Sequence, residues 1–254
     1  MSASRWKGFV VPGALLIAAE IGMRTRESDS LSLAAPSDIA AALVRILVDG
    51  SLLAATRDTL VTAGVGLFLG GVIGLILGML FGLVETVDRL MEVTVEAVRP
   101  IPSVAVLPIA MLLLGFGYRM EIAIVAFSCL WPIMILTRSA MGGIEPRLME
   151  VARALRLSTW SQLRKIVLPA ALPRIMVAFR LAAAIALVVS VTVEIAVNPI
   201  GLGYGILIAQ QALQPAIMLA YLVWIGIVGW GLNGLLSLVQ NKFFGRIGRV
   251  ETIT

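Results

Sequence analysis

Long uncharged stretches constrain this chain more than any other feature of its sequence. Residues Leu60 to Val84 form a run of 25 residues without a charge, and Leu181 to Asn241 contain one charged residue, Glu194. A helix needs about 20 apolar residues to cross a bilayer, so the first run is one span and the second is too long for one. The chain is 59% hydrophobic and 14% charged, whereas soluble domains have about 45–50% and about 25%. We therefore predict an all-α, polytopic membrane helix bundle.

Hydropathy predicts six spans in a single transmembrane domain that covers residues 1–254. The long second run is divided at residues 198–203, where the sequence reads Asn-Pro-Ile-Gly-Leu-Gly. A weaker apolar stretch near the start of the chain lacks a small-residue cleavage site, so we expect a retained helix rather than a signal peptide. The six predicted spans are about 7–23, 60–84, 102–118, 121–138, 175–197 and 215–240.

The distribution of Lys and Arg predicts the orientation of these spans. With both termini in the cytoplasm, 15 of the 20 basic residues lie on the inner side or at inner helix ends. Cytoplasmic segments carry an excess of Lys and Arg, so the opposite orientation is disfavoured. We expect a multi-pass protein of the bacterial cell (inner) membrane.

Two local patterns predict how the helices pack. Gly66, Gly70, Gly74, Gly78 and Gly82 recur every four residues and form a stripe along one face of the predicted span 60–84. Such a stripe allows a close helix–helix approach, and the sequence leaves open whether that contact is static or slides during transport. Between the first two spans, the residues from Pro36 onward have the start signal and the spacing of an amphipathic helix.

The absence of histidine limits the chemistry that the chain can perform. No Ser-His-Asp triad, no Cys-His pair and no imidazole proton switch can be built without it. Cys129 is the only cysteine, so an intrachain disulfide is impossible. No carboxylate pair lies within one predicted span. We therefore expect no enzyme activity, no catalytic residues, and no metal or cofactor of the chain's own.

Residues 139–174 form a long, basic loop between the fourth and fifth predicted spans. Pro146 suits the first turn of a helix, and Ser158 or Thr159 is suited to cap a second helix. We expect that second helix to end before Pro169. A pair of cytoplasmic helices with an apolar face is suited to contact a partner or to pack on its own bundle, and the pattern alone leaves both open.

The same loop resembles the cytoplasmic signature of membrane subunits of binding-protein-dependent ABC importers. That signature reads Glu-Ala-Ala, three residues, Gly, nine residues, Ile, one residue, Leu-Pro. This chain has Glu150-Val151-Ala152, Arg156 at the Gly position, and Ile166-Val167-Leu168-Pro169. The first Ala and the Gly are not matched. With the segments 99–105, 168–173 and 201–204, the chain resembles the nitrate, sulfonate and taurine branch and an ABC importer type I permease.

The resemblance implies that the loop is a coupling helix that docks in a groove of a cytoplasmic ATPase. The implied contact residues are Glu150, Ala152, Arg153, Leu155, Arg156, Leu157, Ser158 and Trp160. A Gly between two helices usually has a left-handed backbone, which costs a non-Gly residue about 1–2 kcal/mol. Arg156 therefore either bears that strain or belongs to a different turn.

The resemblance also implies partners that the chain does not itself provide. It has no Gly-x-x-x-x-Gly-Lys-Ser/Thr phosphate loop, so ATP is bound by a separate ABC ATPase dimer. A periplasmic or lipid-anchored solute-binding protein delivers the solute, and a second permease copy, most simply in a homodimer, completes the pathway. Membrane lipids surround the assembly, and we expect no nucleic acid. The branch implies a small nitrate-, sulfonate- or taurine-like solute.

Glu194 is a candidate for the translocation pathway or its gate, because charges inside membranes are costly and often functional. The alternative is a hydrogen-bonded helix end near Asn198. Ser190 lies about one turn away on the same face of a helix, and Thr192 is a weaker candidate. The rival function is an ion-coupled secondary transporter or channel subunit, which would predict charged residues at mid-membrane and internal repeats.

Overall fold

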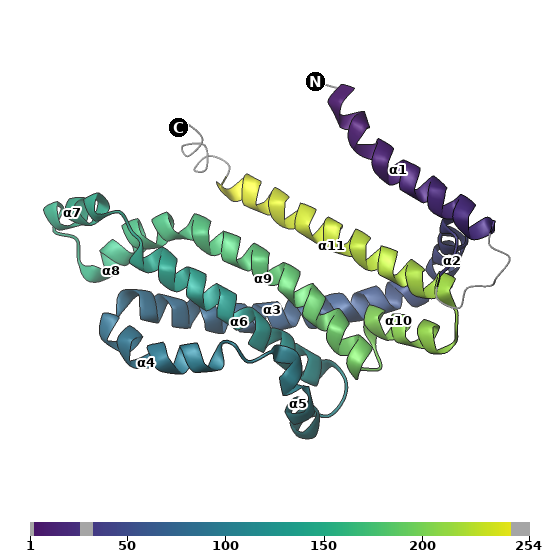
Figure 1. Ribbon diagram of the computed structural model, residues 1–254. Coiled ribbons are helices and arrows are strands. Elements are labelled where there is room, and N and C mark those ends of the chain that lie inside the picture. The colour runs from purple at the N-terminus through teal and green to yellow at the C-terminus, as the bar shows by residue number, and fades with distance from the viewer. Residues whose placement is uncertain (1–2, 26–32, 245–254) are drawn as a thin grey trace.

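The structure is a computed structural model that describes residues 3–25 and 33–244, and all regular elements in these ranges are helical (Figure 1). A 3₁₀ turn covers Ser103–Val106, and a π-helical turn covers Leu163–Val167. The α-helices are α1 Ala3–Arg24, α2 Pro36–Val48, α3 Ser51–Leu83, α4 Glu85–Val98, α5 Leu107–Leu114, α6 Tyr118–Gly142, α7 Pro146–Ala154, α8 Thr159–Gln162, α9 Leu168–Ala196, α10 Gly201–Gln211 and α11 Pro215–Phe244.

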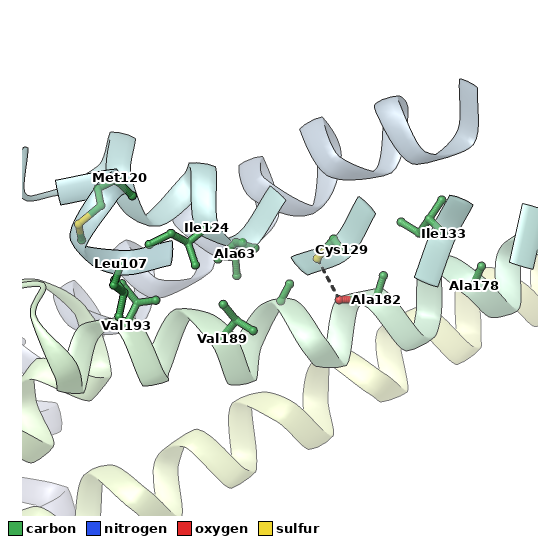
Figure 2. Close-up of a cluster of buried hydrophobic side chains, with 13 residues drawn as sticks. Ala63, Leu107, Met120, Ile124, Cys129, Ile133, Ala178, Ala182, Val189 and Val193 are labelled. Atoms are coloured by element: carbon green, nitrogen blue, oxygen red, sulfur yellow. Dashed lines mark hydrogen bonds between the residues drawn. The ribbon is translucent and has the colours of Figure 1, made fainter. Parts of the chain in front are cut away.

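The centre of the bundle is formed by α3, α6 and α9, which pack on one another along their lengths. Their shared core contains apolar side chains that are almost completely buried, among them Ile124, Ile133 and Val193 (Figure 2). The Cys129 thiol also lies in this core, where it donates a hydrogen bond to the Ala182 carbonyl oxygen at 3.4 Å. The thiol therefore serves as a packing group between α6 and α9.

The glycine stripe of α3 faces α6. A Cβ atom added at Gly70, Gly74 or Gly78 would overlap backbone carbonyl oxygens of α6. Added at Gly66 or Gly82, it would overlap the side chains of Val125 and Met141. Close helix–helix packing, which the sequence predicted for this stripe, is therefore confirmed.

The predicted span 102–118 is not one straight helix. The structure divides it into the 3₁₀ turn and the short α5, which together make an angle of 81° with α4. Pro102 precedes the turn and Gly115, with φ of 70°, follows α5, and both residues interrupt regular helix. The Arg138 guanidinium on α6 binds the Asp88 carboxylate at 2.6 Å and so ties α4 to the bundle.

The amphipathic α2 packs on the bundle through Ala42 and Ile46, which contact a cluster that includes Leu202 and Tyr221. It begins at Pro36, as the sequence predicted. Helix α1 contacts α2, where the Glu20 carboxylate accepts hydrogen bonds from the backbone N–H and hydroxyl of Ser37. Figure 1 shows α7 and α8 at one end of the bundle and α2 and α10 at the other.

Four helices of the described residues are long and apolar enough to cross a membrane, and the bent α4–α5 pair is a fifth candidate. The four are α3, α6, the continuous helical segment that contains α9, and α11. Helix α1 contains the predicted span 7–23 and is not among these candidates. The all-α, polytopic bundle is thus confirmed, whereas six spans stay a prediction.

Candidate functional site

The α7–α8 segment is the first candidate site, and its local structure explains its shape. Two residues after α7 ends, Arg156 has a left-handed backbone with φ of 48°. The Leu157 N–H then donates to the Ala152 carbonyl at 3.1 Å, which is the bond of a Schellman C-cap. Arg156 therefore bears the strain that a Gly would avoid. Ser158 caps α8, as its hydroxyl oxygen accepts from the Ser161 N–H.

Helix α8 itself ends at Gln162, but the chain stays helical through Pro169, so the predicted helix end before Pro169 is wrong. Residues 163–167 instead form a π-helical turn that leads directly into α9. A proline ring clashes with the carbonyl four residues earlier in a regular helix. Widened π turns commonly accommodate such breaks in the hydrogen-bond pattern, so Pro169 can lie inside continuous helical chain. The α7–α8 segment is therefore joined to a spanning helix without a flexible linker.

Large apolar side chains of this segment are exposed. Leu155 is 64% exposed, Trp160 is 69% exposed, and Val151 is 52% exposed. Glu150, Arg156 and Ser158 are also exposed, Leu157 is half-buried, and Ala152 is fully buried. The side chain of Arg153 lies outside the described part of the chain. An apolar surface with basic residues around it thus projects from one end of the bundle (Figure 1).

A buried polar cluster at the opposite end is the second candidate site. We define it as Thr59 and Thr62 of α3, Glu121 of α6, Ser190 and Glu194 of α9, and Asn198, all of which have no exposed surface. The Glu194 carboxylate accepts from the Thr59 hydroxyl at 2.7 Å and from the Gly203 N–H at 2.7 Å. Glu121 accepts from the Thr62 hydroxyl at 2.5 Å and from the Asn198 amide at 2.6 Å.

The cluster caps two helix N-termini with side chains from distant parts of the sequence. The Gly203 N–H of α10 is bound by Glu194, and the Leu202 N–H is bound by the Thr59 oxygen at 2.9 Å. The side-chain amide oxygen of Asn198 (Oδ1) accepts from the Gly117 N–H, which precedes α6. Free N–H groups and the helix dipole favour negative charge at these positions. Gly201 is required here, because its φ is 85° and a Cβ would overlap the Glu194 carboxyl.

The structure separates the three residues predicted to line the pathway. Ser190 and Glu194 are buried inside one subunit, whereas Thr192 is half-exposed and donates to the Val188 carbonyl of its own helix. Glu121, Thr59 and Thr62 were not among the candidates predicted from the sequence. Glu121 and Glu194 both stand at ends of predicted spans assigned to the same side of the membrane, which is the signal that could have paired them.

A groove of about 640 Å³ lies at the same end as the buried polar cluster, between α2 and the turn that leads into α11. Arg24, Asp38, Arg45 and Gln214 contribute polar groups to its wall. The groove is a feature of the surface and is separate from the buried cluster.

Comparison with known proteins gives the chain a family context. Residues 70–249 match the family model described as binding-protein-dependent transport system inner membrane component. Two of its relatives are named, provisionally, as transporter permease proteins. The aliphatic sulfonates transport permease protein SsuC of Bacillus subtilis is 27% identical, over 93% of this chain and 86% of its own length. An ABC transporter permease protein of Methanocaldococcus jannaschii is 32% identical, over 78% of this chain and 75% of its own length.

A third relative and a solved structure extend the comparison. The bicarbonate transport system permease protein CmpB of Synechococcus elongatus is 28% identical, over 93% of this chain and 84% of its own length. A solved chain of the MetNI methionine ABC transporter, in an inward-facing conformation, superposes with a TM-score of 0.66 and 23% identity. That superposition covers 75% of this chain and 95% of the solved one, and it shows a shared fold.

Proposed function

Because this chain belongs to the family of binding-protein-dependent inner membrane transport components, we propose that it carries a small anionic solute inward. We propose that the ATPase drives this transport by binding to α7 and α8. The family makes the chain a permease subunit of an ABC importer in a membrane, and a transporter rather than an enzyme. It also implies two kinds of partner, an ATPase and a solute-binding protein. The driving element, the solute and the stoichiometry are the proposed parts.

The exposed apolar surface of the α7–α8 segment is the observation that carries this proposal. Trp160 and Leu155 project into solvent although burial of a large apolar side chain gains about 1.5–3 kcal/mol. A groove on a partner that covers them would recover that free energy. Residues 146–165 contain five basic residues and one acidic residue, so acidic groups on the rim of that groove would complement the segment.

Continuous helix between the segment and α9 supports a mechanical role. The chain runs from α8 through the π-helical turn into α9 without a break. Movement of a docked ATPase would therefore be transmitted directly to a core helix of the bundle. The proposed contact residues remain Glu150, Ala152, Arg153, Leu155, Arg156, Leu157, Ser158 and Trp160. Of these, fully buried Ala152 would act by supporting α7.

The proposed assembly pairs two copies of this permease with two ATPase subunits. Six spans with both termini in the cytoplasm place the α7–α8 segment inside and α10 outside. A solute-binding protein would then dock at the outer end, near the groove beside α2. Thr192 and the neighbouring residues Ser190 and Glu194 belong to the helix proposed to border the pathway. The relatives named for sulfonates and bicarbonate support a small anion as the solute.

Substitution of Trp160 tests the coupling role. We expect Trp160→Ala, in cells that also express the cognate ATPase, to lower ATPase co-purification and solute uptake at least tenfold while membrane abundance stays unchanged. The matched control is Trp230→Ala, which removes an 80% exposed Trp from α11. Normal ATPase association and uptake in the Trp160 variant would refute docking through this segment.

A further inference from the structure

The carboxyl groups of Glu121 and Glu194 share one buried space. Both side chains have no exposed surface, although they come from different helices and are 73 positions apart in the chain. The two carboxyls belong to one hydrogen-bonded cluster, because Glu194 accepts from Thr59 and Glu121 accepts from Thr62, three residues further along α3. Two ionised carboxylates offer only acceptors to each other, so a hydrogen bond between them requires a proton.

Neutral donors surround the pair. The donors to Glu194 are the Thr59 hydroxyl and the Gly203 N–H, and those to Glu121 are the Thr62 hydroxyl and the Asn198 amide. The Thr62 hydroxyl has one proton but also lies 3.0 Å from the Thr59 carbonyl oxygen. That carbonyl competes with Glu121 for the same proton.

No Lys or Arg of the described residues forms an ion pair with either carboxyl. The charged or titratable groups near the pair in sequence are Arg57 and Asp58 on α3, Tyr118 and Arg119 on α6, and Tyr204 on α10. Arg57 pairs with Asp58 at 2.8 Å, and both interact with Tyr118. Helix α9 carries no other titratable residue within a turn of Glu194, and α5 carries none. The helix dipoles of α6 and α10 compensate part of one charge.

Burial without a counter-ion disfavours two negative charges in contact. Like-charged carboxylates that share a site hold a proton between them, because each ion makes ionisation of the other more costly. We propose that Glu121 and Glu194 share one proton, so that one carboxyl donates a hydrogen bond to the other and joins α3, α6, α9 and α10 at this end of the bundle.

The shared proton has a structural consequence. Glu194 holds the N-terminus of α10, and Glu121 is bound to Asn198 in the turn before α10. Thr59 connects Glu194 to α3, and Thr62 connects Glu121 to it. With the proton present, these groups form one continuous hydrogen-bonded unit. Without it, two adjacent negative charges repel and the unit separates. The inference concerns the isolated chain and does not depend on the proposed import function.

Infrared spectroscopy of the full-length chain in lipid vesicles at neutral pH tests the proposal. We expect wild-type protein to show the C=O stretching band of one protonated carboxyl group. Glu121→Gln and Glu194→Gln should each abolish this band, because the remaining carboxyl ionises beside a neutral amide that can donate the replacement hydrogen bond. Glu92→Gln, at an exposed position of α4, is the matched control and should keep the band.

Thermal unfolding separates the shared proton from simple packing. Both Gln variants should unfold near the wild-type temperature, since the amide restores the donor, whereas Glu121→Ala and Glu194→Ala should unfold several degrees lower. Absence of the band in wild-type protein would overturn the proposal even if a variant fails to fold. A band that persists in both Gln variants, or that only one of them removes, would also overturn a proton shared by the pair.

Discussion

At the scale of single residues, the tightest constraint on the bundle is the absence of side chains along α3. Gly70 lies against the backbone of α6, where a Cβ would overlap the Ala126 carbonyl oxygen. No side-chain rearrangement relieves a contact with backbone, so α6 itself would have to shift. Gly64, one and a half turns earlier on the same helix, has open space around it.

These two glycines give a matched pair of substitutions. We expect Gly70→Ala to destabilise the bundle by about 1–3 kcal/mol, the usual cost of overpacking a close-packed interior. Gly64→Ala should be neutral or stabilise by up to about 1 kcal/mol, because alanine favours helix over glycine. Thermal unfolding of both variants in detergent measures the difference. Equal unfolding temperatures would show that α3 and α6 do not approach as closely as the structure has them.

Residues that act across long distances in the chain could not be predicted from sequence. Glu194 is conspicuous as the one charge in a long apolar run, and a hydrogen-bonded helix end near Asn198 was one of its two predicted roles. Its partner Thr59 is 135 positions away, and Glu121, which lies in the same buried cluster, is 73 positions away. The predicted topology assigns both glutamates to one side of the membrane but does not indicate that they meet. Only the packing of α3, α6 and α9 brings these side chains together.

At the scale of elements, hydropathy and capping signals predict most helices because both act locally. The helix starts at Pro36 and Pro146 and the cap at Ser158 were predicted from a few neighbouring residues and are present in the structure. The bend between α4 and α5 was not predicted, because Pro102 marks a break in the helix but not the direction that the chain takes after it. The Asp88–Arg138 pair that ties α4 to α6 joins residues 50 positions apart. Continuous helix through Pro169 likewise depends on a π turn that leaves no simple sequence pattern.

Helix α10 offers a prediction about one element, since side chains of other helices cap its first turn. Thr59→Val keeps the shape of the side chain but removes both the donor to Glu194 and the acceptor for the Leu202 N–H. A buried N–H without a partner costs about 1–3 kcal/mol. We expect faster amide hydrogen exchange throughout 201–211 and a lower unfolding temperature.

The control for this variant is Thr192→Val. The Thr192 hydroxyl donates to the Val188 carbonyl, so its hydrogen bond stays within its own helix. Exchange in α10 should therefore stay at the wild-type rate. If Thr59→Val also leaves that exchange unchanged, the N-terminus of α10 does not depend on α3.

At the scale of the whole molecule, the two candidate sites lie at opposite ends of the bundle (Figure 1). The α7–α8 segment projects at one end, and the buried polar cluster joins four segments at the other. Helix α9 connects the two, because it continues from the α7–α8 segment, carries Glu194 in its last turn and is followed by Asn198. A displacement at α7 and α8 would therefore act on one long helix whose far end is held by hydrogen bonds to α3, α6 and α10.

This arrangement requires the two ends to face opposite sides of the membrane, as the excess of Lys and Arg in the α7–α8 half predicts. A single cysteine placed at exposed Ser158 or at exposed Gln210 reports which side of the membrane that end of the bundle faces. The background is Cys129→Ser, whose hydroxyl can keep the hydrogen bond to the Ala182 carbonyl. In intact cells, a membrane-impermeant thiol reagent should label the Gln210 variant and leave the Ser158 variant unlabelled until the membrane is opened. Labelling of Ser158→Cys from outside would reverse the orientation and separate α7 from any cytoplasmic ATPase.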